Sequence, residues 1–481
     1  MQGTITFADA CLEPALFGDW FSGPTWANWR VIDKAIFGLQ LDADELEIFR
    51  HLTGRDDAPT DPAEEVWLVI GRRGGKDVKS AALSVYLATI GVEAYGWKER
   101  LVRGERGVVQ LLAVDRDQAQ VAFRYIEGFF EKPVFAKMVK RRTADTIELL
   151  NGFAIEVTTA DQRRVRGRTV VAAVYDEVSF WRSENTMSPD IDVHRAVKPA
   201  MATMPGAMVV GISSPYARRG LLWNKYKKHY GKAGKVLVVQ APTWVMNPNV
   251  PRDGELIQEA YTDDPESASA EFGAIFRSDI SSFITKEAVE ACVETGVRER
   301  PPQKQFRYVG FVDPSGGAVD SMTVAIAHKE GDTAILDAIR EIKPPFSPEA
   351  TVAEFAELLK TYRISRVTGD RYAGEWTREP FQRAGIFYEA NARPKSDLYR
   401  DFLPLINSRA CQLLENDRMV NQIASLERRV GRSGKDLIDH EKNSHDDVAN
   451  VVAGVITLVA AGPSLIVSDR EWNNFRPRQV A

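Results

Sequence analysis

The stretch VWLVIGRRGGKDVKSAALSVYLA, residues 66–88, contains the strongest structural signal in the chain. A short apolar run at 66–70 leads into a glycine-rich turn, and a helical pattern begins close to Lys76. In a strand–turn–helix unit of this kind, N–H groups of the turn and of the helix N-terminus point at a phosphate, and a lysine reaches the outer phosphates. The stretch therefore predicts a phosphate-binding loop in an α/β domain, with Gly74, Gly75 and Lys76 against the nucleotide.

The loop departs from the usual G-x-x-x-x-G-K-[ST] pattern at two positions. Ile70 stands where the first glycine is expected, and Asp77 stands where a serine or threonine would bind magnesium. Ser80, one helical turn later, can take that role only if the start of the helix is displaced. Taken alone, the stretch is also compatible with a basic surface turn after a strand, so a second motif has to decide.

A second apolar strand, TVVAAVYDEVSFW at residues 169–181, ends in Asp176 and Glu177. Paired acids at a strand end are common, but after a phosphate loop and on a neighbouring strand they are typical of an ATPase. Asp176 would hold Mg²⁺ through water, and Glu177 would orient or activate the attacking water. The two motifs together predict ATP and Mg²⁺ as cofactors.

A third apolar strand, MVVGISSPYARRG at residues 208–220, ends in Ser213 and Ser214. Hydroxyl groups at this position can sense the γ-phosphate and pass its loss to the next element, although a plain strand-to-turn Ser-Pro would look the same. Basic residues near these motifs are candidates for a finger acting on a neighbouring subunit's ATP, for DNA backbone contacts, or for a solvated loop. They are Arg163, Arg164, Arg166, Arg168, Arg218 and Arg219.

Three groups of carboxylates follow residue 307. Asp313 ends the strand-like run YVGFVD, Asp370 ends a second short strand, and Asp446 with Asp447 opens an apolar helix. Several carboxylates are needed to hold two Mg²⁺ or Mn²⁺ ions for phosphodiester hydrolysis. We expect Asp313 to bridge the ions and Asp370 and Asp447 to complete the site, with Asp446 as a further ligand or as an acid at the helix N-terminus. Lower-ranked candidates nearby are Asp320, Glu375 and His445.

The composition is that of an ordinary globular protein of 481 residues, with 44% hydrophobic residues, 27% charged residues and a net charge of −5. The net charge is unlike that of a free-standing nucleic-acid binder, so any DNA contact must come from a local patch or from several subunits. The three cysteines have no metal-binding spacing, which favours a reducing compartment. We see no signal peptide, and the apolar stretch 448–467, interrupted at Gly462-Pro463, predicts a buried helix rather than a membrane span.

The length predicts two domains. Apolar runs at 66–70, 108–114, 170–175, 208–212 and 236–239 alternate with helical patterns, which indicates a mainly parallel sheet with helices on its faces. From residue 307, three strand-like runs followed by mixed α/β patterns suggest a compact nuclease-type domain. We expect an N-terminal segment at 1–60 packed on a P-loop ATPase domain at 61–280, with 247–283 as the join, then a nuclease domain at 281–465 and a tail at 466–481.

The order GRRGGKD, VVAAVYDE and GISSP resembles the ATPase half of the large terminase subunits of tailed bacteriophages, and the acid trio resembles their ribonuclease-H-like, resolvase-type nuclease. The resemblance covers most of residues 60–460. It implies that Lys76 binds phosphates, that Asp176 binds magnesium and that Glu177 is the catalytic glutamate. It also places four residues in known motifs: Arg72 and Arg73 in the arginine-bearing part of the loop, and Ser213 and Ser214 in the coupling motif.

The function implied by this resemblance is ATP-driven movement of double-stranded DNA through a portal into a procapsid, together with cleavage of concatemeric DNA. The implied partners are DNA, the small terminase subunit, the portal protein and further copies of the chain in a ring, with no membrane. The implied place is the bacterial host cytoplasm, with transient docking on the procapsid and absence from the mature virion.

Two other functions remain to be compared with this one. A helicase-nuclease of DNA repair or restriction would carry further helicase motifs and another acid pattern. A scaffold that binds nucleotide without turnover is supported only by Asp77. Within the first 60 residues, Trp26, Trp29 and Phe37 either stack on adenine or fill the core.

Overall fold

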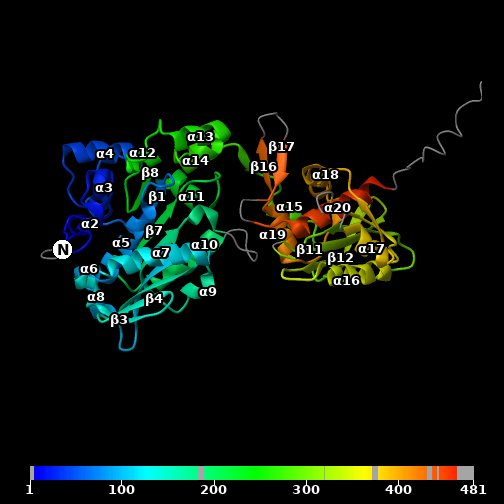
Figure 1. Ribbon diagram of the computed structural model, residues 1–481, viewed down its shortest axis with the longest axis horizontal. Helices are drawn as coiled ribbons and strands as arrows, with labels where there is room; N and C mark the ends of the chain where they lie inside the picture. The colour runs from blue at the N-terminus through cyan, green and yellow to red at the C-terminus, as the bar shows by residue number, and fades with distance from the viewer. Residues whose placement is uncertain are drawn as a thin grey trace, which may run out of the picture. The chain divides into compact units, whose positions relative to one another are not determined.

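The computed structural model describes residues 5–181, 189–318, 320–370, 377–430, 436–440 and 444–462. The chain divides into two compact units, Met1–Ile280 and Ser281–Ala481, which Figure 1 draws in blue to green and in green to red. The predicted tail at 466–481 and the candidate Glu375 lie outside the described residues. Within the described part, no helix is both long enough and apolar enough to span a membrane.

The first unit is built on an eight-stranded sheet in the order β3-β4-β5-β2-β6-β7-β1-β8. The six strands from β5 to β8 in this order run parallel, and β3 and β4 add an antiparallel edge. The strands are β1 (Glu65–Ile70), β2 (Gly107–Ala113), β3 (Val139–Arg142), β4 (Thr146–Leu149), β5 (Phe153–Thr159), β6 (Thr169–Asp176), β7 (Met208–Ser213) and β8 (Val236–Ala241). The mainly parallel sheet confirms the predicted fold class of this part of the chain.

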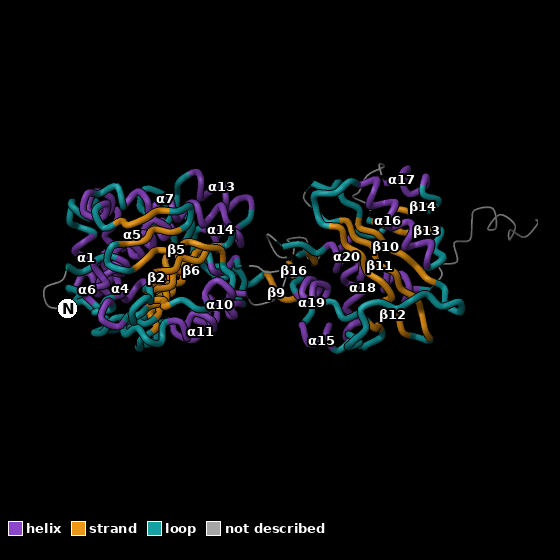
Figure 2. Tube along the Cα trace, turned by 90° about the horizontal axis from the view of Figure 1, so that it is seen from below, coloured by secondary structure: helices purple, strands orange, loops and turns teal. Residues whose placement is uncertain are grey.

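Helices cover both faces of this sheet, because successive side chains of a strand point to opposite sides. Along β1, Val66 and Leu68 face the core that includes α5, whereas Trp67 faces the core that includes α10 and α11. Figure 2 shows α5 and α7 on one side of the sheet and α10 and α11 on the other. The main helices are α5 (Lys76–Ala88), α7 (Arg116–Phe129), α10 (Pro189–Ala200), α11 (Gly220–His229), α13 (Glu255–Asp263) and α14 (Pro265–Glu271).

The N-terminal helices share the core of α5. Their main members are α1 (Phe7–Ala10), α3 (Ala27–Ile36) and α4 (Ala43–Thr53). Trp29 and Phe37 are 2% and 3% exposed in this core, so both are packing residues rather than an adenine platform. Asp33 on α3 forms a buried ion pair of 2.6 Å with Lys79 on α5. The N-terminal segment is therefore held against the helix that follows the phosphate loop.

The second unit contains a six-stranded sheet in the order β14-β13-β10-β11-β12-β15. Strands β10, β11 and β12 form an antiparallel meander, and β13 lies parallel to β10 on its other side. This strand order is that of the ribonuclease-H-like fold. The strands are β10 (Tyr308–Asp313), β11 (Met322–Glu330), β12 (Thr333–Ile342), β13 (Arg366–Gly369), β14 (Phe387–Ala390) and β15 (Cys411–Gln412).

Helix α20 (Asp447–Ala461) packs on one face of this sheet, and α16 (Pro348–Thr361) packs on the other. The helix approaches β10 so closely that a Cβ atom at Gly454 would lie 2.7 Å from the Phe311 ring. The same core holds α15 (Lys286–Glu290), α18 (Lys395–Asn407) and α19 (Asp417–Ala424). A separate three-stranded sheet joins β9 (Ile280–Ser282) to the hairpin β16 (Glu427–Val430) and β17 (Asp436–Asp439).

Candidate ATP site and candidate nuclease site

The three motifs of the first unit meet at the carboxyl ends of β1, β6 and β7. The sequence interpretation placed the Asp176 strand next to the strand of the phosphate loop, and this is wrong, because β7 lies between them. Strand β7, which ends in Ser213, therefore lies between β1, which precedes the phosphate loop, and β6, which ends in Asp176. A neighbour relation of this kind depends on pairing over more than 100 residues and has no local signal in the sequence.

The phosphate loop is held in one shape by side chains from outside it. Trp29 Nε1 donates a hydrogen bond of 2.9 Å to the carbonyl of Gly74, and Trp26 packs so near Gly75 that a Cβ atom there would lie 2.9 Å from the ring. Gly75 has a φ of +86°, which glycine adopts without strain. On the other side, the carbonyls of Arg72 and Arg73 accept hydrogen bonds from Thr243 Oγ1 (2.7 Å) and Asn247 Nδ2 (2.9 Å).

Lys76 lies at the centre of the site and is 3% exposed. Its Nζ atom is 2.7 Å from Glu177 Oε1 and 3.6 Å from Asp77 Oδ1. Burial alone would lower the pKa of Lys76, but the nearby carboxylates outweigh burial and raise it. The lysine is therefore a buried cation whose partners are acids of the same site.

Asp176 is buried beside Lys76. Burial, followed by the charges of Asp77 and Glu177, raises the pKa of Asp176 to about 8. Gln118 Nε2 donates to its Oδ2 atom at 3.2 Å, while its Oδ1 atom has no hydrogen-bond partner among the described residues. A buried carboxylate oxygen without a partner is costly unless something binds it, which is what a site for a cation provides.

Glu177 connects the lysine to the third motif. Ser213 Oγ donates to Glu177 Oε2 at 2.9 Å, and the backbone N–H of Ser214 donates to the same oxygen at 3.3 Å. Glu177 also has a φ of +49°, a left-handed conformation that costs energy for a residue with a side chain. The structure thus places Lys76, Glu177 and Ser213 in direct contact in series.

The structure also shows the surroundings of Ser80 and Asp77, the two candidates for the role of the missing loop hydroxyl. Ser80 Oγ donates to the carbonyl of Asp77 at 2.9 Å, so its hydroxyl is used within the helix. Asp77 Oδ1 is buried and has no hydrogen-bond partner among the described residues. Of the two, Asp77 is the side chain that faces the acids of the site.

The arginines near the motifs lie on the surface or pair locally. Arg72 forms an ion pair of 3.2 Å with Glu271 and is largely exposed. Arg163 pairs with Asp161 at 2.8 Å, and Arg168 pairs with Glu156 at 3.0 Å. The remaining finger candidates have different places: Arg166 is exposed, Arg218 lies over the Trp223 ring at 5.8 Å, Arg219 is the N-cap residue of α11, and the side chain of Arg164 is outside the described residues.

In the second unit, two predicted acids meet across neighbouring parallel strands. Asp313 ends β10 and Asp370 directly follows β13. Asn450 on α20 joins them, because its Nδ2 donates to Asp313 Oδ2 at 2.7 Å and to Asp370 Oδ2 at 3.2 Å. Burial raises the pKa of Asp313 to about 8, with further contributions from Asp370 and Asp447 against the hydrogen bond from Asn450.

Asp447 opens α20, one helical turn before Asn450. Its carbonyl accepts a hydrogen bond of 2.9 Å from Thr323 Oγ1 on β11, which fixes the start of the helix against the sheet. Burial, followed by the charge of Asp446, raises the pKa of Asp447 to about 6. Its Oδ2 atom is buried and has no hydrogen-bond partner within the described parts of the chain.

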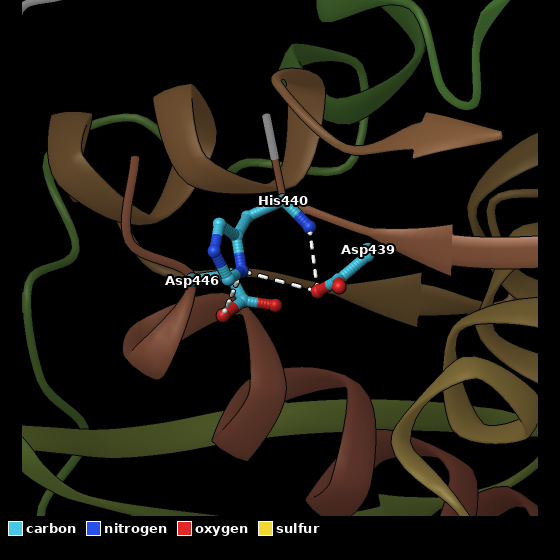
Figure 3. Close-up of side chains that lie close together, drawn as sticks. All are labelled: Asp439, His440 and Asp446. Carbon is cyan, nitrogen blue, oxygen red and sulfur yellow. Dashed lines mark hydrogen bonds and ion pairs between the residues drawn. The ribbon is translucent and has the colours of Figure 1, made fainter. Parts of the chain in front are cut away.

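Asp446 differs from the other predicted ligands, because its carboxylate is already paired with cations. Lys395 Nζ lies 2.9 Å from Asp446 Oδ2, and Tyr399 OH donates to the same oxygen at 2.6 Å. Figure 3 shows the imidazole of His440 with ion pairs to both Asp439 and Asp446, at 3.1 and 3.2 Å. These two acids raise the pKa of His440 to about 10, so the ring is a cation at neutral pH.

The cluster of Asp439, His440 and Asp446 has the spacing of a metal site, since one ligand atom from each lies within 4.8 Å of the others. Its charges argue against a metal. Lys395 Nζ also lies 3.3 Å from Asp439 Oδ1, so two cations already neutralise the two carboxylates. We therefore interpret the cluster as a salt-bridge network beside the carboxylate site.

The lower-ranked candidates His445 and Asp320 pair with each other at 3.5 Å, and both are exposed. Sequence reasoning missed several residues that hold the two sites. They are Gln118, Thr243, Asn247, Lys395, Tyr399, His440 and Asn450. Asn450 had a usable signal, because it lies four residues after Asp446 and three after Asp447, on the same helix face.

Comparisons with known proteins agree on the class of the first unit. Residues 39–274 match the family model described as the N-terminal P-loop domain of the uncharacterized protein MJ0330. This match and the parallel sheet establish a P-loop domain. No curated protein matches the chain.

Solved structures with similar folds include two phage proteins. One is the large terminase of bacteriophage HK97, at 15% identity and a TM-score of 0.38, covering 90% of this chain and 99% of that chain. The other is the large terminase nuclease of the thermophilic phage G20c with bound magnesium, at 13% identity and a TM-score of 0.33, covering 37% of this chain and 98% of that one.

Proposed function

We propose that this chain is a DNA-packaging motor subunit of the large-terminase type, which hydrolyses ATP to move double-stranded DNA and cleaves that DNA with divalent metal ions. The observation that carries the proposal is that one chain contains both a candidate ATP site and a candidate nuclease site. One joins Lys76, Glu177 and Ser213 at a phosphate loop, and the other joins Asp313 and Asp370 through Asn450 on a ribonuclease-H-like sheet. The order of the sequence motifs, which resembles that of large terminases, supports the same function.

At the ATP site, the residues suggest how binding and hydrolysis are connected. Lys76 now pairs with Glu177, and a bound nucleotide would draw the ammonium group toward its outer phosphates. Glu177 would then be free to orient the attacking water, while its second oxygen stays on Ser213. Loss of the γ-phosphate would return Lys76 to Glu177, and Ser213 would transmit that change to the segment after β7.

The residues of this site also fit a magnesium ion. Asp77 Oδ1 and Asp176 Oδ1 are both buried carboxylate oxygens without hydrogen-bond partners among the described residues. Mg²⁺ prefers oxygen ligands, and one or two carboxylates together with substrate phosphates are its usual partners. We propose that Asp77 takes the place of the missing hydroxyl and holds the ion together with Asp176. The bound ion would neutralise charge on the phosphates.

At the nuclease site, we propose Asp313, Asp370 and Asp447 as the metal ligands, with Asp446 in a positioning role. Asp447 Oδ2 has no hydrogen-bond partner among the described residues, and burial raises the pKa of Asp313 to about 8, and both observations fit a site for a cation. Bound Mg²⁺ or Mn²⁺ would activate water and stabilise the leaving oxygen of a phosphodiester. Asn450 would orient the two strand-end carboxylates, and Lys395 with His440 would keep Asp446 turned away from the ions.

The partners implied by this function are proposals of the same kind. They are double-stranded DNA, a small terminase subunit, a portal with its procapsid, and further copies of the chain in a ring. In a ring, one of the surface arginines would act on the ATP of a neighbouring subunit. The place of action would be the cytoplasm of the infected bacterium, with transient docking on the procapsid.

The test is to assay the purified full chain for ATP hydrolysis and for cleavage of supercoiled plasmid, each with Mg²⁺, with Mn²⁺ and with a chelator. We expect both activities with metal and neither with the chelator. Cleavage without ATPase activity would remove the motor from the proposal and leave a nuclease. ATPase activity that drives strand separation of a duplex would favour the helicase-nuclease, and nucleotide binding without either activity would favour the scaffold.

A further inference from the structure

The segment 218–235 is a strongly basic part of the first unit. It contains seven lysine and arginine residues and neither aspartate nor glutamate, in a chain whose net charge is −5. The segment comprises the end of the loop after β7, helix α11 and the turn that leads into β8. A concentration of one charge in so short a stretch can create a local positive field.

Some of these basic side chains form ion pairs with acids of the first unit, and others are exposed to solvent. Lys225 pairs with the buried Glu65 at 2.5 Å, and Lys235 pairs with Glu64 at 2.6 Å. Lys227, Lys228 and Lys232 are exposed, and their ammonium groups form no ion pair with the described residues. These three lysines therefore point a net positive charge to the solvent.

Aromatic rings of the same segment anchor α11 within the fold. Trp223, Tyr226 and Tyr230 lie along α11 as a stacked series, with ring centroids 5.8 and 4.8 Å apart. Phe276 packs against Trp223 and Tyr226, so the helix is anchored on a rigid base. Anchored basic side chains on a helix suit contacts to a phosphate backbone, which require position and charge but no pocket.

Helix α11 is also the element that directly follows the coupling motif. Only Pro215 to Arg219 separate Ser214 from the first residue of the helix. The helix start is fixed by the backbone N–H of Leu221, which donates to Asp190 Oδ2 on α10 at 2.5 Å. Along the chain, α11 is therefore the first helix that a displacement of Ser213 on loss of the γ-phosphate would reach.

We propose that Lys227, Lys228 and Lys232 form a contact surface for the phosphate backbone of duplex DNA, and that α11 is the element through which the ATP site acts on DNA. The inference rests on the proposed function and deepens it by naming the surface that the motor uses. Duplex DNA is favoured over other polyanions because the second unit of the same chain carries a carboxylate site suited to phosphodiester cleavage.

The test compares binding of a labelled duplex by the full chain and two triple variants, using fluorescence anisotropy over a range of salt concentrations with Ca²⁺ in place of Mg²⁺ to limit cleavage. The test variant is Lys227→Ala, Lys228→Ala and Lys232→Ala. The matched control is Lys98→Ala, Lys137→Ala and Lys140→Ala, which removes the same charge from exposed lysines, two of them near β3 at the opposite edge of the sheet. Thermal unfolding verifies that both variants fold.

We expect the test variant to bind more weakly than the control for every duplex sequence. The association constant K decreases with salt, and the magnitude of the slope of log K against log[salt] should become smaller in the test variant. The decrease should be roughly 0.9 for each phosphate that a lysine no longer neutralises, and so up to roughly 2.7 for three lysines. Equal slopes for the two variants would overturn the inference. So would a test variant that no longer binds vesicles of anionic lipid but keeps the wild-type slope for DNA.

Failure of the proposed function has a different signature. Basal ATP hydrolysis without DNA should be the same in both triple variants and the wild type, because none of the six lysines lies in the ATP site. If the wild type hydrolyses no ATP, the motor proposal fails whatever the binding curves show. If ATP hydrolysis is present and only the slopes coincide, the surface on α11 is wrong and the motor proposal stands.

Discussion

The two candidate sites handle the same problem of buried negative charge in different ways. In the first unit, Lys76 lies among the acids and pairs with Glu177 at 2.7 Å. In the second unit, the amide of Asn450 joins Asp313 and Asp370, Asp447 lies one helical turn before Asn450, and the cations Lys395 and His440 pair with Asp446. The first site holds a lysine among its acids, whereas the described cations near the second site, Lys395 and His440, pair with Asp446.

This difference indicates what each site requires. Burial among like charges raises the pKa of a carboxyl, and it does so at both sites, where Asp176 and Asp313 have pKa values of about 8. At the first site, Lys76 can move between Glu177 and a phosphate, so the compensating charge can take part in a cycle. At the second site, the described cations hold Asp446, and a bound metal ion would compensate the remaining carboxylates. The predictions below test this contrast.

The largest effect is expected from Asp313→Ala. This change removes a carboxylate that faces both Asp370 and Asp447, so metal binding should fail and plasmid cleavage should fall by roughly 1,000-fold or more, as for loss of one member of a catalytic unit. ATP hydrolysis should remain, because its site lies in the other unit. Plasmid nicking with Mn²⁺ is the measurement, and cleavage at the wild-type rate would show that the active site uses other acids.

The corresponding change at the first site is Lys76→Ala, which removes the cation that we expect to move between Glu177 and a phosphate. ATP hydrolysis should fall by roughly 100- to 1,000-fold, the scale for losing one charge-stabilising donor, while plasmid cleavage persists. Because the lysine is buried among acids, Lys76→Met serves as a control of similar volume, and thermal unfolding reports whether either variant is destabilised. A folded variant with near-normal ATPase activity would rule out the phosphate-loop assignment.

Glu177→Gln keeps the size of the side chain and its contact with Ser213 but removes its charge. We expect ATP to bind at least as tightly as in the wild type, because Lys76 is released from its partner. Hydrolysis should fall by roughly 100-fold or more, within the range for losing a general base. Nucleotide binding by a fluorescent ATP analogue and turnover are measured in parallel, and equal losses in both would point to a structural role.

Asn450→Ala should have a smaller effect on the second site. The amide binds the two strand-end carboxylates rather than the substrate, and loss of such an outer partner typically lowers metal affinity or activity by about 10- to 100-fold. The loss should be recovered in part by raising the Mg²⁺ concentration, which a merely destabilised protein would not show. Asn450→Gln is the conservative control. A cleavage rate unaffected by the alanine change would exclude the orienting role.

The smallest effect is expected from Asp77→Ser, which restores the hydroxyl of the usual loop pattern. A hydroxyl is an adequate magnesium ligand, so ATP hydrolysis should stay within about 10-fold of the wild type, or about 1.4 kcal/mol. Asp77→Leu has similar volume and no ligand atom, and it should lose much more activity. Wild-type turnover in the leucine variant would show that Asp77 does not hold the ion.

The strands that position these sites could be predicted only in part from the sequence. The runs at 66–70, 170–175, 208–212 and 236–239 lie in strands of the first sheet, and the run at 108–114 covers most of β2 and one residue beyond it. All but the edge strand β8 are central strands, which are continuously apolar because a central parallel strand is buried on both faces. The same rule missed β4, where buried Ile147 and Leu149 alternate with partly exposed residues. It also missed β5, whose later positions carry Glu156 and two threonines.

What the sequence determined by itself is the class of the fold and the strand ends at which acids stand, because apolar runs, turns and strand-end residues are local signals. The order of the strands was decided only by the tertiary structure, and with it the position of β7 between β1 and β6. The same is true of the partners that distinguish Asp446 from Asp447, since Lys395 and Tyr399 reach Asp446 from about 50 residues away. Such contacts depend on how the whole unit packs, and packing between distant segments leaves no pattern in the residues on either side.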